Sequence, residues 1–156
     1  MDRQRAERVV RLFESRGELD QLLTFDESVV WACLERARAR LRAATVLLDA
    51  EYWESAYTEA YDAFRTSAEA IVLRLGWRVP AVAGAHRITA DIAHAAVQHV
   101  TEAFAPATAE QFRQGRHESE YFDPERPVDK TKEDAHWALA HAQAAVSAVE
   151  DALSDL

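Results

Sequence analysis

A stripe of large apolar side chains at helical spacing constrains this chain more than any other feature. Between residues 54 and 75, apolar side chains recur every three or four positions, at Tyr57, Tyr61, Phe64, Ala68, Ile71 and Leu75. This spacing places them on one face of an α-helix, and Gly76 follows in the position of a C-cap. The stripe therefore predicts a long amphipathic helix over 54–75 with this face buried.

Five further segments carry the apolar periodicity or the end signals of helices, at about 3–15, 26–49, 86–100, 108–123 and 131–153. Thr24 with Glu27, and Thr108 with Gln111, have capping-box spacing, and Pro106 is expected to break the preceding linker. Residues 77–85 are expected to form a loop. The 156 residues include only four Gly and four Pro, which disfavours sheets. We predict an all-α fold, an antiparallel up-and-down bundle of four core helices with accessory helices.

Composition bears on where the chain acts and on what it binds. No apolar run approaches the roughly 18 residues of a membrane span, and the first residues are charged, so we expect a cytoplasmic protein without membrane contact. The single cysteine, Cys33, cannot form an internal disulfide, which fits a reducing compartment. The net charge of −9 opposes non-specific nucleic-acid binding, so an RNA or nucleotide role requires a local basic site.

The segment EQFRQGRHESEYFD, residues 110–123, concentrates polar chemistry. On a helix, Arg113, Arg116, His117 and Glu120 share one face, and His117 and Tyr121 are neighbours. One interpretation is a solvated face with an Arg116–Glu120 pair and Tyr121 packed in the core. The other is a phosphate-binding site, in which Arg116 is the main contact, Arg113 an auxiliary contact and His117 a hydrogen-bond donor.

The order of several short motifs resembles the bacterial branch of the HEPN superfamily over about residues 30–153. The motifs are Ala56-Tyr57, Ala60-Tyr61-Asp62-Ala63-Phe64-Arg65, Glu69-Ala70, Gly76-Trp77-Arg78, Gly84 with His86, and Arg113, Arg116, His117, Glu120 and Tyr121. The resemblance implies a helical bundle that dimerises and brings two R-x4–6-H motifs into a cleft. In active members this motif cleaves RNA without a metal, since Arg stabilises phosphate charge and His assists attack of the 2′-OH.

This chain departs from that motif at one position. Five residues after Arg116, where the family has His, it has Tyr121, and His117 directly follows the arginine. A phenol is a poor general base at neutral pH, so catalysis stays open. The candidate catalytic residues are Arg116, His117 and Tyr121, and the candidate phosphate contacts are Arg113 and Arg116. Arg65 and Glu69, on the predicted helix 54–75, could orient Arg116.

Three functions follow as hypotheses. The first is a HEPN homodimer that acts as a nucleotide- or RNA-associated component of a toxin–antitoxin or defence system, with a nucleotidyltransferase or toxin–antitoxin protein as its partner. The second is an active metal-independent ribonuclease that uses Arg116 and His117, with Tyr121 orienting the substrate. The third is a non-catalytic protein-interaction bundle. We expect residues 1–25 to form an accessory helix and 26–156 the HEPN-like bundle, with the dimer interface on the helices at 54–75 and 108–123.

Two other sites were weighed. Asp91 with His94, and Glu133 with His136, have the carboxylate-x-x-His spacing of di-metal bundles, but the predicted helix faces direct Glu133 and His94 away from the core. We therefore expect no metal and no cofactor. The basic run 36–42, RARARLR, spreads its arginines over two sides of a helix, which favours a solvated face over a phosphate site.

Overall fold

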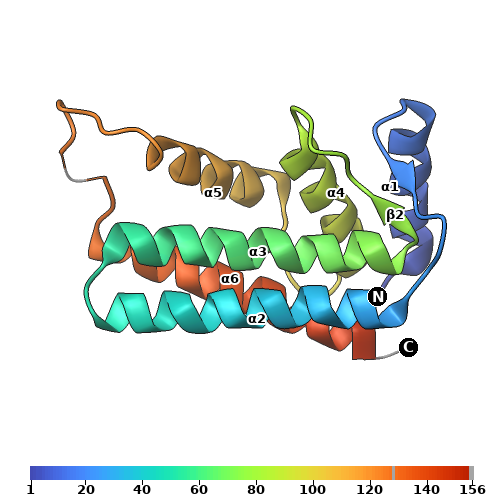
Figure 1. The fold of residues 1–156 in the computed structure, drawn as a ribbon, viewed down its shortest axis with the longest axis horizontal. Coiled ribbons are helices and arrows are strands. Elements are labelled where there is room, and N and C mark those ends of the chain that lie inside the picture. The colour runs from blue at the N-terminus through green and yellow to red at the C-terminus, as the bar shows by residue number, and fades with distance from the viewer. Residues whose placement is uncertain (128, 155–156) are drawn as a thin grey trace.

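Three long helices run side by side and enclose most of the core (Figure 1). They are α2 (Glu27–Asp49), α3 (Trp53–Arg74) and α6 (Lys132–Ser154). The shorter α5 (Pro106–Glu118) lies along the other side of α3, and α4 (Ala85–Val97) and α1 (Arg3–Ser15) pack against each other at one end. This computed structural model describes residues 1–127 and 129–154.

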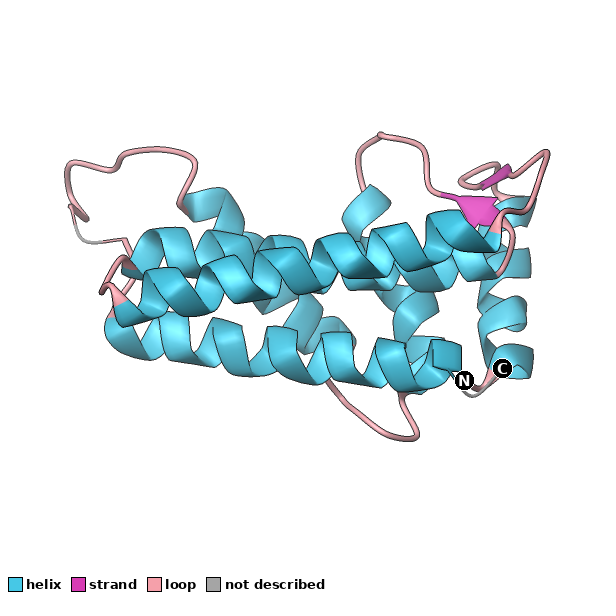
Figure 2. Ribbon diagram, turned by 60° about the horizontal axis from the view of Figure 1, so that its bottom comes forward, coloured by secondary structure: helices cyan, strands magenta, loops and turns pink. Residues whose placement is uncertain are grey.

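The helix directions alternate along α2, α3, α5 and α6, and α4 is inserted between α3 and α5 (Figure 1). This arrangement confirms the predicted all-α antiparallel bundle with accessory helices. Figure 2 shows that the described chain is mostly helix joined by loops, with a very small strand pair. The pair of two-residue strands β1 (Asp20–Gln21) and β2 (Trp77–Arg78) was not predicted, because a pair this short has no periodicity. It joins the loop after α1 to the loop after α3.

Helix ends differ from the prediction in their caps. Asp26, rather than a box of Thr24 and Glu27, caps α2 by accepting a hydrogen bond from the Ser28 amide at 2.8 Å. Pro106 does not break the linker but stands at the first position of α5, where a missing amide proton costs nothing. The box of Thr108 and Gln111 was therefore also misplaced, because both residues lie inside α5.

The predicted stripe of α3 is buried as expected from Tyr57 to Ile71, and its last member, Leu75, is half-buried just after the helix. Twelve of the 22 residues of α3 are buried, because the helix is covered by α2, α6, α4 and α5. Gly76 follows the helix with φ of +86°, a backbone conformation that glycine adopts without strain, which confirms its predicted role as the helix stop. The core is closed largely by alanines, which let α2, α3 and α6 approach one another closely.

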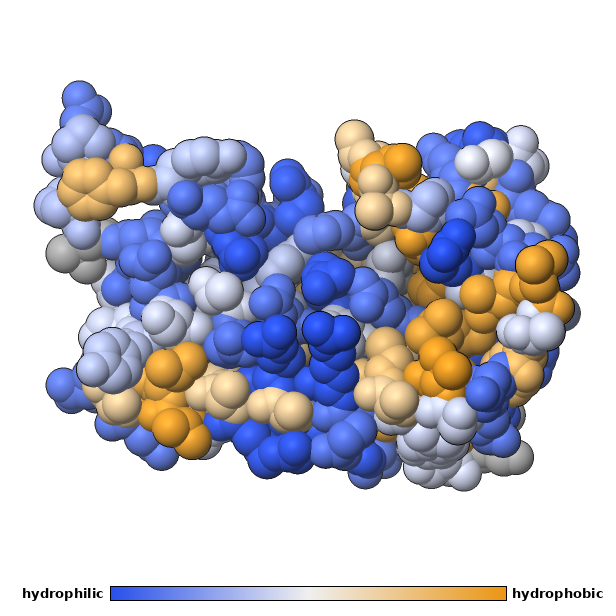
Figure 3. All heavy atoms as spheres, in the orientation of Figure 1, coloured by the Kyte–Doolittle hydropathy of each residue, from blue (hydrophilic) through white to orange (hydrophobic). Residues whose placement is uncertain are grey.

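Three of the four arginines in the basic run of α2 form ion pairs with nearby carboxylates in the described chain. Arg38 pairs with Glu150 of α6 at 2.5 Å, and Arg40 pairs with Glu59 of α3 at 3.0 Å. The hydrophilic band along the middle of the lower helix in Figure 3 corresponds to this part of α2. These pairs support the interpretation of 36–42 as a solvated face. Among the described residues, no helix has the length and apolar character that crossing a membrane requires.

Candidate functional site

Helix α5 is fixed to the bundle by one aromatic side chain. Phe112 is fully buried and is the single buried residue of α5. Its ring centroid lies 5.4 Å from the rings of Tyr57 and Tyr61, 5.0 Å from Phe64 and 5.1 Å from Trp137. Edge and tilted contacts at these distances are favourable for aromatic rings. Phe112 therefore holds the polar face of α5 at a defined place above α3.

Gly115 sets how closely α5 approaches α3. A Cβ atom at this position would lie 2.7 Å from Cζ of Tyr57 and closer still to the tyrosine hydroxyl. The absence of a side chain lets the Tyr57 hydroxyl donate a hydrogen bond to the carbonyl of Phe112 at 3.4 Å. Gly115 stands between Gln114 and Arg116 in the sequence, so this close contact positions the arginine-bearing turn.

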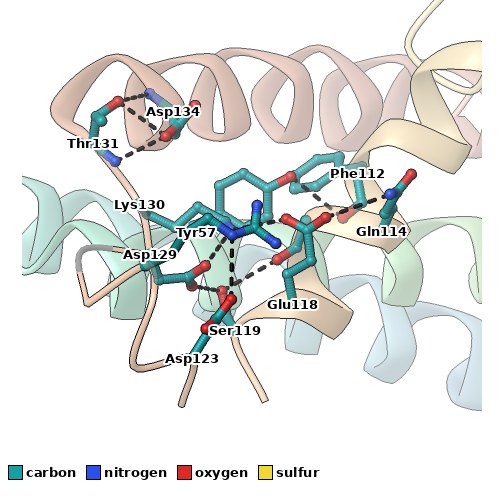
Figure 4. A network of polar contacts seen from close by, with 12 residues as sticks. Tyr57, Phe112, Gln114, Glu118, Ser119, Asp123, Asp129, Lys130, Thr131 and Asp134 are labelled. Atoms are coloured by element: carbon teal, nitrogen blue, oxygen red, sulfur yellow. Dashed lines mark hydrogen bonds and ion pairs between the residues drawn. The ribbon is translucent and has the colours of Figure 1, made fainter. Parts of the chain in front are cut away.

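A polar network closes the far end of α5 onto the start of α6 (Figure 4). Lys130 is only 7% exposed, and its ammonium lies 2.9 Å from Asp129, 4.0 Å from Glu118 and 5.1 Å from the centroid of the Tyr57 ring. The hydroxyl of Ser119 donates to the carboxylate of Asp129. A buried lysine is stable only when its charge is paired, so this network is a structural clamp on the end of α5. Sequence reasoning missed it, because no spacing pattern marks a buried lysine.

Both predicted phosphate contacts are partly exposed on α5. Arg113 forms two hydrogen bonds to Glu110, at 3.0 and 2.7 Å. Arg116 forms the expected ion pair with Glu120 at 3.0 Å, and its side chain is 26% exposed. Both guanidinium groups are thus accessible, but each is held by a carboxylate one turn away. A ligand at either arginine must compete with that carboxylate.

His117 and Tyr121 are neighbours, as predicted, with ring centroids 5.7 Å apart. The side chain of His117 is 62% exposed, and its Nδ1 lies 3.6 Å from Glu120. Tyr121 is 68% exposed, so the interpretation that it packs in the core is wrong. The physical reason is that α5 ends at Glu118, three residues before Tyr121, and the following turn directs the chain away from the bundle.

On its α4 side, α5 borders a groove that the sequence did not indicate. The groove has a volume of about 510 Å³, and the space-filling view is hollowed between α5 and α4 (Figure 3). Its polar lining residues are Tyr61, Arg65, His86, Arg87, Thr89, Asp91, Glu110 and Arg113. Arg65 pairs with Glu69 at 2.5 Å, whereas the carboxylate that Arg116 contacts is that of Glu120. The predicted residues Arg65 and Arg113 thus line one groove, and the structure gives Arg116 a different neighbour.

At the edge of this groove, the hydroxyl of Tyr61 and Nδ1 of His86 form a hydrogen bond of 2.5 Å. Burial raises the pKa of Tyr61 to about 12. The pKa of His86 is lowered, first by partial burial and then by the positive charges of Arg65 and Arg113. Both effects favour the neutral forms of the two side chains at physiological pH. The pair joins residues 25 apart in the sequence, so helical spacing could not reveal it.

The two carboxylate–histidine pairs, Asp91 with His94 and Glu133 with His136, have no third metal ligand beside them in the described chain. Among the residues that the structure describes, no group of three or more His, Cys, Asp and Glu side chains is placed to hold a metal ion. Asp91 instead lines the groove, where burial raises the pKa of its carboxyl, and His136 is exposed on α6. The groove and α5 together present guanidinium groups, imidazoles, phenols and carboxylates.

Comparison with known proteins gives one match. A family model described as the HEPN domain matches residues 30–152, which span α2 to α6 and include every candidate site residue. The same comparisons found no match among curated proteins or solved structures.

Proposed function

Because this chain belongs to the HEPN family, we propose that it binds a phosphate-bearing ligand, RNA or a nucleotide, through α5, as a component of a toxin–antitoxin or defence system. The observation that carries the proposal is the pair of accessible guanidinium groups, Arg113 and Arg116, on a helix fixed by Phe112 and Gly115. Guanidinium groups form charge-assisted, bidentate bonds with phosphate oxygens. A helix held in a defined position presents them without a large ordering cost.

Binding without rapid cleavage is the form of this function that the site supports best. The family histidine position holds Tyr121, which is exposed beyond the end of α5. The remaining imidazole on α5, His117, lies beside Glu120, which also holds Arg116. Glu120 repels a phosphate at the place where the active ribonuclease hypothesis requires Arg116 and His117 to act together.

The proposal includes a homodimer, because members of this family commonly dimerise. Most of α3 is buried within one chain, so the interface would use mainly α5 and the polar edge of α3 beside it. Light scattering at micromolar concentration should give twice the 17.5 kDa of one chain. A mass of 17.5 kDa alone would contradict the dimer. A nucleotidyltransferase gene beside this one would support the proposed type of partner.

Binding of a short fluorescein-labelled RNA, followed by fluorescence anisotropy at several salt concentrations, tests the proposal. We expect affinity to fall steeply with salt, because each phosphate contact releases counterions. Arg116→Ala should weaken binding about tenfold or more and reduce the salt slope by about one. Tyr121→Phe should weaken it only modestly.

The matched control is Arg126→Ala. Arg126 is an exposed arginine that pairs with Asp123 at 3.3 Å, three residues before it, much as Arg113 pairs with Glu110. It carries the same charge but lies in the loop after α5, so its loss should leave binding nearly unchanged. Unchanged affinity in Arg116→Ala would remove α5 from the functional account and favour a protein-interaction bundle.

A further inference from the structure

The groove between α3, α4 and α5 combines an apolar floor with a cationic rim. The floor is formed by Phe64, Ala68, Ala90, Pro106 and Ala109. The rim carries three guanidinium groups, of Arg65, Arg87 and Arg113, against the two carboxylates of Asp91 and Glu110. In a chain of net charge −9, this local excess of positive charge distinguishes the groove from the rest of the molecule.

The three arginines differ in how strongly the protein already binds them. Arg65 is paired with Glu69 at 2.5 Å, and Arg113 is paired twice with Glu110. Arg87, at the start of α4, makes no ion pair within residues 1–127 and 129–154. An anion entering the groove therefore meets one unpaired guanidinium, and it recruits a second if Arg113 exchanges Glu110 for the anion.

The Tyr61–His86 pair supplies a hydrogen-bonding group at the same rim. Nδ1 of His86 is engaged by the hydroxyl of Tyr61 at 2.5 Å, which leaves Nε2 as the ring nitrogen available to solvent or to a ligand. The tyrosine is buried and fixed among Phe64 and Phe112, whereas the histidine is only partly buried and remains accessible to solvent. Tyr61 therefore orients an accessible imidazole without blocking it.

We infer that this groove binds a phosphoryl group of the ligand, with Arg87 and Arg113 holding its oxygens and His86 donating a hydrogen bond from Nε2. The inference rests on the proposed function, since that proposal supplies a phosphate-bearing ligand. It adds three residues, Arg87, His86 and the positioning residue Tyr61. It assigns the hydrogen-bond donation by an imidazole to His86 on α4 rather than to His117 on α5. Arg113 belongs to both sites and connects them.

Binding of an anion at His86 depends on pH, because the protonated imidazole adds both a charge and a donor. The titratable and charged groups around His86 come from every element packed against it. They are Tyr61, Asp62, Arg65 and Glu69 of α3, Arg78 of β2, Arg87 and Asp91 of α4, Glu110 and Arg113 of α5, and Glu120 after α5. In the free protein, partial burial with Arg65 and Arg113 lowers the pKa of the imidazole. A bound anion opposes this effect, so affinity rises as pH falls through the pKa of His86 in the complex.

The test uses sodium sulfate, a tetrahedral dianion that does not itself titrate near neutral pH, with the His86 imidazole observed by NMR. The signal is assigned by its loss in His86→Gln. We expect sulfate to shift the His86 signal and to bind several-fold more tightly at pH 5.5 than at pH 7.5. Sulfate affinity in the variants is measured by isothermal titration calorimetry. In His86→Gln the affinity should be weaker and independent of pH, whereas His136→Gln, which replaces an exposed histidine on α6, should behave as the wild type.

The competition with Glu110 provides a second variant that does not remove a contact residue. Glu110→Gln frees Arg113 from its carboxylate, so sulfate should bind several-fold more tightly than to the wild type. The matched control is Glu150→Gln, which removes the same charge from an ion pair with Arg38, away from the groove. Equal gains in both variants would mean that only the net charge matters, and would overturn the assignment of Arg113.

The source of the phosphoryl group is distinguished by displacement of sulfate from His86. Displacement by a short RNA assigns the groove to RNA, and displacement only by a mononucleotide assigns it to nucleotides. Three results would overturn the inference. The first is no displacement by either ligand, and the second is no sulfate shift at His86. The third is a pH dependence of sulfate affinity that disappears in His117→Gln but persists in His86→Gln. RNA binding that depends on Arg116 while His86 does not respond would leave the proposed function intact and reject the groove alone.

Discussion

Helices α3 and α5 lie side by side, but they are held in the molecule in opposite ways. Helix α3 buries twelve of its 22 residues and contacts every long helix of the bundle. Helix α5 buries one of its thirteen residues, Phe112, and apart from the contact of Gly115 with Tyr57 most of its surface faces solvent or the groove. The difference shows where a chain of this size can place chemistry, since a helix that contributes little to the core can carry charged side chains.

The contrast also predicts how the two helices respond to change. A substitution at a buried position of α3 acts on the whole fold, because the buried side chains of α3 pack against α2, α4, α5 and α6. A substitution on the outer face of α5 acts on ligand binding and leaves folding nearly unchanged. Three features hold α5 against the bundle, namely Phe112, Gly115 and the Lys130 network. A substitution at one of these should change both stability and ligand binding.

The largest effect is expected from truncation of the aromatic core. Phe64→Ala or Tyr61→Ala should lower the free energy of unfolding by roughly 3–5 kcal/mol, because each leaves a cavity between α3 and α5. Arg116→Ala should lower it by less than about 1 kcal/mol, since its partly exposed pair with Glu120 contributes little. Urea unfolding monitored by circular dichroism measures all three. A midpoint for Arg116→Ala as low as that of Phe64→Ala would reverse the assigned faces.

A smaller change in stability is expected for Gly115→Ala, with the opposite sign to that of Gly→Ala in an ordinary helix. In an ordinary helix, Gly→Ala stabilises by roughly 0.5–1 kcal/mol. Here the added methyl group meets the ring of Tyr57, so Gly115→Ala should destabilise by about 1–3 kcal/mol and weaken RNA binding, because α5 is displaced.

Two further variants sharpen the Gly115 prediction. Tyr57→Phe removes the atom nearest to the new methyl group, so the double variant should lose less stability than the two single losses added together. Gln114→Ala, at the exposed neighbouring position, should change stability little. Stabilisation by Gly115→Ala would mean that α5 is not held against Tyr57.

The smallest effect concerns the pH dependence of stability at the groove. Because the pKa of His86 is lower in the folded protein than in the unfolded chain, the unfolded chain binds more protons near pH 6. This group therefore stabilises the fold above the unfolded histidine pKa of about 6.5, and its contribution is lost as pH falls below it. Unfolding free energies at pH 5.5 and 7.5 should differ less in His86→Gln than in the wild type. An equal or larger difference in the variant would contradict the partial burial of His86.

Most of the fold could be predicted because the apolar residues of its helices recur with helical periodicity. The α3 stripe and the stop at Gly76 depend on local spacing, and both were found. The caps were less predictable, since Thr24 and Asp26 are both acceptable cap residues and tertiary packing decides which one begins α2. The predicted end of α5, near residue 123, was wrong, since the helix ends at Glu118. The hydroxyl of Ser119, just after it, donates to Asp129 ten residues later, a contact that local spacing does not reveal.

The candidate site was only half accessible to sequence reasoning. The face of Arg113, Arg116 and His117 follows from positions one turn apart on one helix. The groove forms only where α3, α4 and α5 meet. The spacing of residues in the sequence therefore predicts neither the position of Arg87 in it nor the hydrogen bond between Tyr61 and His86. Spacing gives Gly115 no assigned role, because that role depends on the ring of Tyr57, 58 positions earlier in the chain.

Hydrogen exchange with and without RNA tests the account most directly, because it reports on α3 and α5 in one experiment. In the free protein, amides of α5 should exchange orders of magnitude faster than those of α3, because α5 buries one residue and α3 buries twelve, so less packing opposes local opening of α5. RNA should slow exchange in α5 and at the start of α4, residues 85–89, and leave the basic run 36–42 of α2 unchanged. Protection of residues 36–42 without protection of α5 would contradict the account.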